Sequence, residues 1–338
     1  MIDFRSDTVT KPTDAMREAM KIANVGDDVY EDDETIKQLE NLAKEITGKE
    51  TALFVPSGTM GNQIAIMTHT RRGDEIIVGA HSHIKNYEVG AASVLSSVSY
   101  HLVPETDGMM DIDLLKKGIR GEDIHYPDTS LICMENAHGS GVVAPLSYMK
   151  DVYAIAKAYN LNVHLDGARL FNAATHLNCD VKAITQYADS IMFCLSKGLA
   201  APIGSMLVGS SEFIKRARKY RKLLGGGMRQ VGVLGAPGLI ALNDMRHRLK
   251  EDHDNAKYLA DNLSALPGFT VDTSRRDINM VFVRVDYDKD AFADYLKTNH
   301  NIIIGGYKDE YMRLVCHNDI KKDDIDTFIL AIKTFIKD

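Results

Sequence analysis

The sequence predicts an α/β protein with two domains: a large one built on a mostly parallel seven-stranded sheet, and a small α+β one after it. Short apolar runs alternate with longer amphipathic runs over most of the chain, which is the pattern of βαβ units. The length of 338 residues allows about two domains. Hydrophobic residues make up 45% of the chain and charged residues 26%, which is typical of a folded globular protein.

Seven short apolar runs define the strands of the large sheet: 51–55, 75–78, 97–103, 130–134, 162–165, 190–194 and 205–208. Amphipathic runs between them predict helices at 34–46, 61–69, 147–159 and 168–174. Gly48 follows the first of these helices, where a glycine in the left-handed region commonly ends a helix.

The remaining sequence predicts a helical connection and the small domain. From the triple glycine at 225–227 to about residue 266 the sequence has helical character, which Pro237 and Pro267 are expected to break. The elements expected beyond it are strands at 269–271, 279–285 and 311–315 and helices at 290–298 and 323–335. We place the boundary near residue 245. An N-terminal arm and the large domain then cover residues 1–245, and the small domain covers residues 246–338.

Charge and composition exclude several classes of partner. The formal net charge of −7 is spread without a basic block, so we expect neither a nucleic acid nor an anionic membrane. The most apolar stretch, 191–209, contains Lys197 and Pro202, which favours a buried core over a membrane span. Four scattered cysteines form no C-x-x-C pair, so we expect neither disulfides nor a metal site. The first residues lack the apolar stretch of a signal peptide, and the sequence therefore predicts a cytoplasmic protein.

A turn of small residues, Ser57-Gly58-Thr59, joins the strand at 51–55 to the next helix. Free main-chain N–H groups at a helix N-terminus and two hydroxyls can hold a phosphate, and Gly58 allows a close approach. The alternative is an ordinary turn in which Thr59 caps the helix. The turn lacks the G-K-[ST] of a Walker loop and the G-x-G-x-x-G of a dinucleotide site.

Two apolar strands end in chemically active side chains. Asp166 follows the strand at 162–165 and can pair with a protonated ring nitrogen or cap the next helix. Arg169 is either a partner for a phenolate oxygen or a solvated helix residue. Lys197 lies one crossover further on, at the same edge of the sheet. A desolvated lysine amine is the nucleophile that imine formation needs, and the alternative is a lysine that extends its ammonium to water.

A phosphate-binding turn, an acid for a ring nitrogen and an imine-forming lysine at one sheet edge are the groups that pyridoxal 5′-phosphate requires. This cofactor takes up the electron pair that is released when a bond at an amino acid's Cα breaks. His83, in the loop after the strand at 75–78, can stack on the pyridine ring, act as an acid or base, or do both. The sequence thus predicts a pyridoxal-phosphate enzyme that acts on a small amino acid.

Motifs along nearly the whole chain resemble those of low-specificity L-threonine aldolases. The matching segments are MIDFRSDTVTKP (1–12), VGDDVY (25–30), the turn at 57–59, LDGAR (165–169), LSKG (195–198), GGGMRQ (225–230) and MRLV (312–315). The resemblance implies the aspartate-aminotransferase-like fold, known as fold type I. It also implies reversible cleavage of L-threonine and L-allo-threonine to glycine and acetaldehyde.

The resemblance further implies which residues bind the cofactor. Lys197 would hold it covalently, and Asp166 would pair with its pyridine nitrogen. Arg169 would contact its 3′ oxygen, and His83 would stack on its ring. The turn at 57–59 would bind its phosphate.

Other residues would bind the substrate or complete a neighbouring site. Ser6 and Arg313 would hold the α-carboxylate, with Arg313 as a bidentate fork. His125 would lie near the substrate side chain. Arg229 would reach the phosphate in a neighbouring subunit, which implies a homo-oligomer, a dimer or a tetramer, with shared sites. The alternative for the triple glycine before Arg229 is a flexible loop without function.

Two questions stay open at this point. The base that takes the β-hydroxyl proton is His83, His125 or a water between them. The reaction itself has alternatives on the same scaffold, namely a β-eliminating lyase or an amino-acid racemase. A third interpretation is a non-catalytic protein that holds a mononucleotide at residues 57–59.

Overall fold

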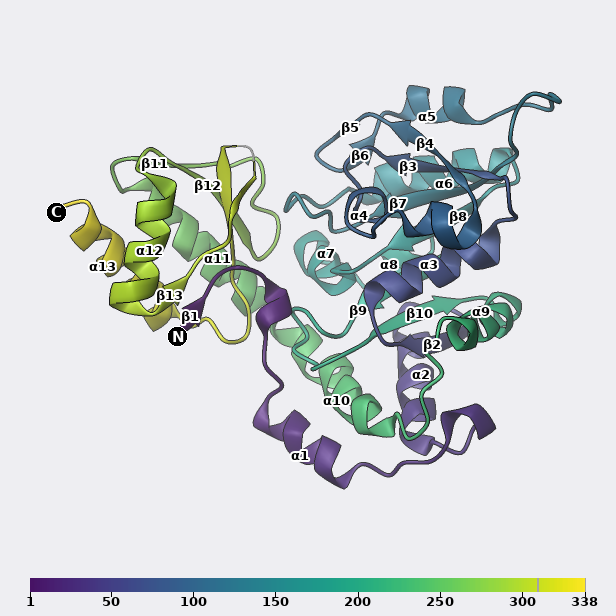
Figure 1. Ribbon diagram of the computed structural model, residues 1–338, viewed down its shortest axis with the longest axis horizontal. Coiled ribbons are helices and arrows are strands. Elements are labelled where there is room, and N and C mark those ends of the chain that lie inside the picture. Colours follow the sequence, from purple (N-terminus) through teal and green to yellow (C-terminus); the bar gives the residue numbers. More distant parts are fainter. Residues whose placement is uncertain (309, 338) are drawn as a thin grey trace.

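The computed structural model describes residues 1–308 and 310–337, and the chain forms a large and a small unit joined by long helices (Figure 1). The large unit is built on a seven-stranded sheet with the order β2-β10-β9-β8-β7-β3-β4. Its strands are β2 (Thr51–Val55), β10 (Ser205–Gly209), β9 (Ser190–Cys194), β8 (Asn162–Asp166), β7 (Thr129–Glu135), β3 (Glu75–Gly79) and β4 (Ser99–Val103). Strand β10 runs antiparallel to both neighbours, and the other pairings are parallel. The predicted mostly parallel, seven-stranded sheet is therefore confirmed.

Helices cover both faces of this sheet, so β3, β9 and β10 are buried along their whole length, and after a polar first residue each consists of apolar residues or glycine. The longer helices are α2 (Glu34–Thr47), α3 (Gly58–His69), α6 (Leu146–Ala158), α7 (Leu170–Leu177), α9 (Ser211–Leu223) and α10 (Gly232–Asn243). Gly48 ends α2 at φ 69° and donates its N–H to the carbonyl of Lys44, as predicted. The shorter elements are α4 (His83–Asn86), the π-turn η3 (Ala92–Ser96), β5 (Glu105–Thr106), β6 (Met109–Met110), α5 (Ile112–Gly118) and α8 (Lys182–Thr185).

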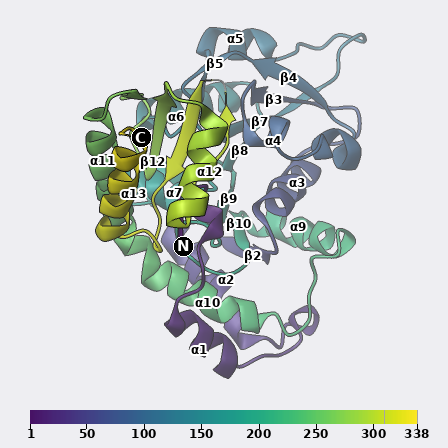
Figure 2. The ribbon, with the colours of Figure 1, turned by 60° about the vertical axis from the view of Figure 1, so that its left-hand side comes forward.

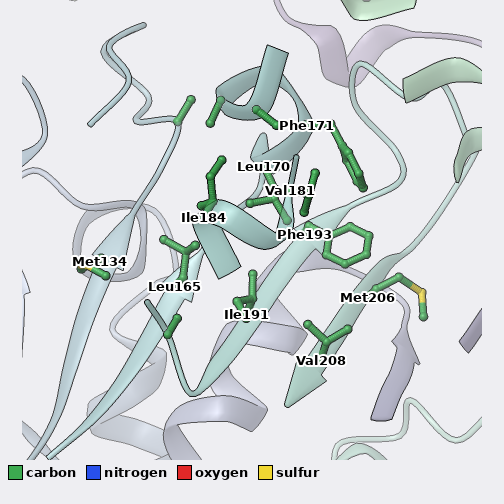
Figure 3. Packing of buried hydrophobic residues seen from close by; sticks show 14 of the residues in the cluster. Met134, Leu165, Leu170, Phe171, Val181, Ile184, Ile191, Phe193, Met206 and Val208 are labelled. Atoms are coloured by element: carbon green, nitrogen blue, oxygen red, sulfur yellow. The ribbon is translucent and has the colours of Figure 1, made fainter. Parts of the chain in front are cut away.

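The core beside β8 and β9 fixes the strand ends that carry Asp166 and Lys197. Figure 3 shows Leu165 of β8 and Ile191 of β9 packed beside side chains of α7 and α8. These two strand residues are register partners. Phe171 of α7 stands edge-on to Phe193 of β9, with ring centroids 5.4 Å apart. Because this core is close-packed, the ends of the two strands have little freedom to move relative to each other.

The expectation that Pro237 breaks the helical stretch is wrong. Pro237 lies inside α10, which continues to Asn243 before the short turn η4 (Met245–Arg248). A proline in a helix interior costs about 3 kcal/mol, but α10 packs tightly against α2 and α1 (Asp14–Ile22). A Cβ at Gly235 or Gly238 would collide with side chains of α2. Tertiary packing therefore outweighs the local preference.

The small unit follows in the order α11 (Leu249–Ser264), β11 (Phe269–Val271), β12 (Met280–Val285), α12 (Lys289–His300), β13 (Ile302–Ile303), β14 (Tyr307–Lys308), β15 (Tyr311–Val315) and α13 (Lys322–Phe335). Four of its strands form an antiparallel sheet of order β11-β12-β15-β14. In Figure 2 this unit comes forward, and a separate hydrophobic core joins its sheet to its three helices. The domain boundary near residue 245 stays a prediction.

The N-terminal arm belongs to both units. Strand β1 (Ile2–Asp3) pairs in parallel with β13 of the small unit, and the side chain of Phe4 is buried in that unit's core. The arm then crosses to the large unit through the short turns η1 (Asp7–Val9) and η2 (Asp28–Tyr30), on either side of α1. Within the described residues, no helix is long and apolar enough to span a membrane.

Candidate active site

A cavity of about 920 Å³ lies where the carboxyl ends of β3, β7 and β8 meet the arm and the small unit. Six of the residues singled out in the sequence line it together: Ser6, His83, Asp166, Arg169, Lys197 and Arg313. Ligands of open α/β sheets bind outside the carboxyl ends of the strands, and this cavity has that position.

Asp166 ends β8 and is buried, with 2% of its surface exposed. One carboxylate oxygen accepts the N–H of Ala168 at 3.1 Å, and the other accepts the side-chain amide of Asn62 at 2.8 Å. Helix α7 begins at Leu170 with Arg169 at the N-cap, so Asp166 is not the capping residue. Among the described residues no lysine, arginine or histidine forms an ion pair with it. A buried carboxylate of this kind is suited to a ligand cation.

Lys197 follows β9 by three residues and is half-buried. Its main-chain carbonyl accepts the hydroxyl of Thr10 at 3.0 Å, which ties the arm to this turn. In the described part of the chain its ammonium has neither a hydrogen bond nor an ion pair. A flexible amine that lines a cavity and has no protein partner is available to react with a ligand.

Arg169 forms a buried bidentate ion pair with Asp7 of the arm, with N···O distances of 2.8 and 2.6 Å. Burial alone would raise the pKa of Asp7, but the Arg169 guanidinium holds that pKa well below its usual range. The pair uses two of the five N–H groups of Arg169 and fixes its plane at the cavity wall. Asp7 was not singled out from the sequence, although it lies in the N-terminal segment that resembles the family signature.

Arg313 reaches the cavity from β15 of the small unit. Burial and the nearby charge of Arg169 lower its pKa. Ser6 comes from the arm, where its hydroxyl oxygen accepts the N–H of Thr8 at 3.2 Å. Two guanidinium groups and a hydroxyl therefore converge from different units, which favours binding of a carboxylate.

His83 begins α4, and its ring Nδ1 lies 2.9 Å from a carboxylate oxygen of Glu88. The hydrogen bond to Glu88, opposed by partial burial, raises the pKa of His83. The main-chain N–H of His83 donates to Glu135 at 2.8 Å. Burial raises the pKa of Glu135, and His138 opposes that rise.

Three groups of predicted residues lie away from this cavity. His125 is in the loop after α5 with 81% of its side chain exposed, and its Nδ1 is 2.8 Å from Asp123. Arg229 is 55% exposed and pairs with Asp27 at 3.1 Å. The turn at 57–59 begins α3 outside the cavity lining.

The alternative in which Thr59 caps α3 is wrong. Ser57 is the N-cap, and its hydroxyl oxygen accepts the N–H of Met60 at 3.2 Å. Among the hydrogen bonds of the described residues, none uses the N–H groups of Gly58 and Thr59. These two donors at the helix N-terminus are therefore free for an anion.

Several buried polar residues near the cavity were missed from the sequence: Asn62, Glu88, Glu105, Glu135 and His138. Glu135 could have been recognised from the sequence, because it ends an apolar strand, β7, as Asp166 ends β8; the two residues are register partners. The rule that singled out Asp166 applies equally to it. Asn62 and Glu88 lie in a helix and a loop without a local signal, and only the packing of α3 against the sheet brings them to the site.

The fold is that of a known class of enzymes. A model of the beta-eliminating lyase family matches residues 3–286, and the chain belongs to that family. A solved structure described as SPT with a PLP internal aldimine aligns with a TM-score of 0.77 at 17% identity, covering 98% of this chain and 86% of that one. The fold is thus that of the type I pyridoxal-phosphate enzymes.

Within this family the chain belongs with the low-specificity L-threonine aldolases. It is 45% identical to the low specificity L-threonine aldolase of Escherichia coli K12 over 96% of both chains. The structure described as threonine aldolase from Leishmania major aligns with a TM-score of 0.85 and 20% identity, covering 99% of this chain and all of that one.

Proposed function

We propose that this protein is a pyridoxal-phosphate-dependent aldolase that cleaves L-threonine and L-allo-threonine reversibly to glycine and acetaldehyde. One observation carries the proposal: Asp166, Lys197 and Arg313 line one cavity, although they come from β8, the turn after β9 and the small unit. The name of the 45%-identical relative supports the same reaction.

The residues of the cavity fit the cofactor. The buried carboxylate of Asp166 would pair with the pyridine nitrogen, and Lys197 would attach covalently to the aldehyde carbon. His83 would lie against one face of the ring. Arg169, held by Asp7, has further N–H groups for the 3′ oxygen. The free N–H groups of Gly58 and Thr59 would bind the phosphate, together with Ser57.

When bound, pyridoxal 5′-phosphate takes up the electron pair that is released as a bond at the substrate's Cα breaks. The chain's own residues decide which bond that is. Arg313 and Ser6 would hold the α-carboxylate and so orient the substrate about Cα. An orientation that places the Cα–Cβ bond perpendicular to the conjugated system selects aldol cleavage over loss of the carboxylate or of the Cα proton. His83, His125 or a water would take the proton from the β-hydroxyl.

The positions of His125 and Arg229 support a homo-oligomer with shared sites. Both are exposed and lie away from the cavity of their own chain. Exposed apolar side chains of the arm and α9, including Ile22, Tyr30 and Leu223, offer a contact surface. Four free cysteines support a reducing, cytoplasmic location.

The proposal is tested by steady-state assay of L-threonine, L-allo-threonine, L-phenylserine and L-serine with the purified holoenzyme. We expect glycine and the corresponding aldehyde. Formation of ammonia and a keto acid, or racemisation alone, would instead assign one of the other reactions of this scaffold. Shared sites are tested by mixing Arg229→Ala and Lys197→Ala subunits. Mixed oligomers should regain part of the activity, because one site in each is then intact.

A further inference from the structure

Glu88 is a buried carboxylate that the proposed reaction does not use. It lies in the loop after α4, and its side chain is fully buried. Its oxygens accept the side-chain amides of Asn62 at 2.8 Å and Gln63 at 2.6 Å, and Nδ1 of His83 lies 2.9 Å away. No lysine or arginine forms an ion pair with it within residues 1–308 and 310–337. Burying a carboxylate in this way is costly unless its neighbours donate hydrogen bonds or carry positive charge.

The same amide of Asn62 joins Glu88 to Asp166. Its nitrogen donates to both carboxylates, at 2.8 Å each, and its oxygen is 3.0 Å from Nε2 of His164. Carboxylates can only accept hydrogen bonds, so the amide nitrogen of Asn62 must face them. The amide oxygen then faces His164, which must donate a hydrogen bond from Nε2. Nδ1 of His164 then accepts from Ser190, which lies 2.9 Å away. Burial lowers the pKa of His164 to about 3, so this ring stays neutral and the direction of each bond is fixed at neutral pH.

The hydrogen bond with Glu88 also determines which ring nitrogen of His83 carries a proton. Because Glu88 accepts only, the His83 ring must carry a proton on Nδ1. Its other nitrogen, Nε2, is then the atom that gains or loses a proton. The ring is 40% exposed and lines the cavity. A carboxylate behind a histidine holds the ring in one tautomer and stabilises its protonated form.

We propose that Glu88 is a positioning residue that holds the proton of His83 on Nδ1, aligns Nε2 with the cavity and, through Asn62, links this ring to Asp166. The proposal rests on the proposed function for its place in the reaction. In that reaction a proton can pass between the substrate hydroxyl and Nε2 while the proton on Nδ1 stays in place, so the ring becomes a cation next to Glu88.

Other charged groups also face His83. Glu135 of β7 accepts its main-chain N–H, and a carboxylate oxygen of Asp166 of β8 lies within 4.8 Å of a ring nitrogen of His83. Tyr87 stands with its ring centroid 5.5 Å away. The cations Lys197, Arg169 and Arg313 line the same cavity and oppose protonation. Among these three acids, Glu88 is distinguished by its direct hydrogen bond with the imidazole ring.

The experiment is an NMR titration of the histidine ring nitrogens in the holoenzyme labelled with 15N at Nδ1 and Nε2, with His83 assigned from His83→Gln. In the unaltered protein above the pKa of His83, we expect the tautomer protonated at Nδ1. The tautomer protonated at Nε2 would overturn the proposal without any variant. The readout does not depend on cleavage of threonine, so a failure here is distinguishable from a failure of the proposed reaction.

Variants at Glu88 give the second measurement. Glu88→Gln removes the charge and should lower the pKa of His83 by about 1, a tenfold change in its protonation constant. The acid limb of the pH profile of kcat/KM should move in the same direction. Glu88→Asp keeps the charge and should restore part of the difference. An unchanged titration of His83 in Glu88→Gln would refute the assignment.

Glu40→Gln is the matched control, because Glu40 is also a buried carboxylate that accepts hydrogen bonds, from the N–H of Phe54 and from Arg218. It lies on α2 and does not line the cavity. We expect the titration of His83 to be unchanged in this variant. A shift equal to that of Glu88→Gln would show that any buried charge has this effect and would also overturn the proposal.

Discussion

The two sides of the cavity are built differently. On one side, Asp166 and the turn with Lys197 follow neighbouring parallel strands of a close-packed sheet. On the other side, Ser6 and Arg313 belong to the arm and to the small unit, which has its own core. Side-chain contacts such as Arg169 with Asp7 and Thr10 with the carbonyl of Lys197 join the two sides. The groups on the sheet side are therefore fixed by one close-packed core, whereas those on the other side are placed by contacts between separate units.

The largest expected effect is on the sheet side. Lys197→Ala should lower kcat by about 10³-fold or more, because the amine that we propose attaches the cofactor is lost. The fold should be intact, since the ammonium has no partner among the described residues. Activity and borohydride trapping of the cofactor measure this loss. Lys250→Ala, at an exposed lysine paired with Asp254, is the control, and equal trapping in both variants would contradict the role of Lys197.

The next effect concerns the link between the two sides. Asp7→Asn should lower the free energy of unfolding by about 3–5 kcal/mol, because it leaves the buried Arg169 guanidinium without a counter-charge. The pKa of Asp7 is lower in the folded chain, so its contribution is present above the ordinary aspartate value of about 4 and declines as the pH falls below it. Urea unfolding of both proteins at several pH values measures the difference. A difference that grew toward acid pH would contradict this sign.

A smaller effect is expected from the small unit. Arg313→Ala should lower kcat/KM for L-threonine by about 10²-fold, mainly through KM, because the charge-assisted contact that we propose with the substrate carboxylate is lost. Arg284→Ala removes a half-exposed arginine from the neighbouring strand β12 and should leave both constants unchanged. If Arg313→Ala lowered kcat alone, the carboxylate would be held elsewhere.

The smallest effect tests the second contact between the two sides. Thr10→Val removes the hydroxyl that lies 3.0 Å from the main-chain carbonyls of both Lys197 and Asp7, and it should cost about 1 kcal/mol of unfolding free energy. Thr327→Val is matched to it, because the hydroxyl of Thr327 also donates to a main-chain carbonyl, that of Asp323, at an exposed position in α13. Urea unfolding measures both costs. A loss of unfolding free energy in Thr10→Val no larger than that in Thr327→Val would show that the arm contact adds no stability beyond that of an exposed hydroxyl.

The two sides of the cavity also differ in how far the sequence predicts them. Asp166 and Lys197 were found because Asp166 ends one apolar strand and Lys197 comes shortly after the next, and the carboxyl ends of parallel strands lie at one edge of the sheet. Ser6 and Arg313 were named only through resemblance, since neither has a local pattern that places it near that edge. Asp7 and Glu88 were missed because their roles depend on Arg169 and His83, which are brought to them by the fold.

The sequence by itself determined the order of the strands along the chain, the helices between them and the chemical kind of each side chain at the sheet edge. These features follow from the hydrophobic periodicity and from the residues at the strand ends, which can be recognised from the local sequence alone. Only the tertiary structure decided that α10 continues through Pro237, that Asp7 pairs with Arg169, and that Asn62 lies between Glu88 and Asp166. Each of these features depends on contacts between segments far apart in the chain. The energies of such contacts outweigh or supplement local conformational preferences only after the core has packed.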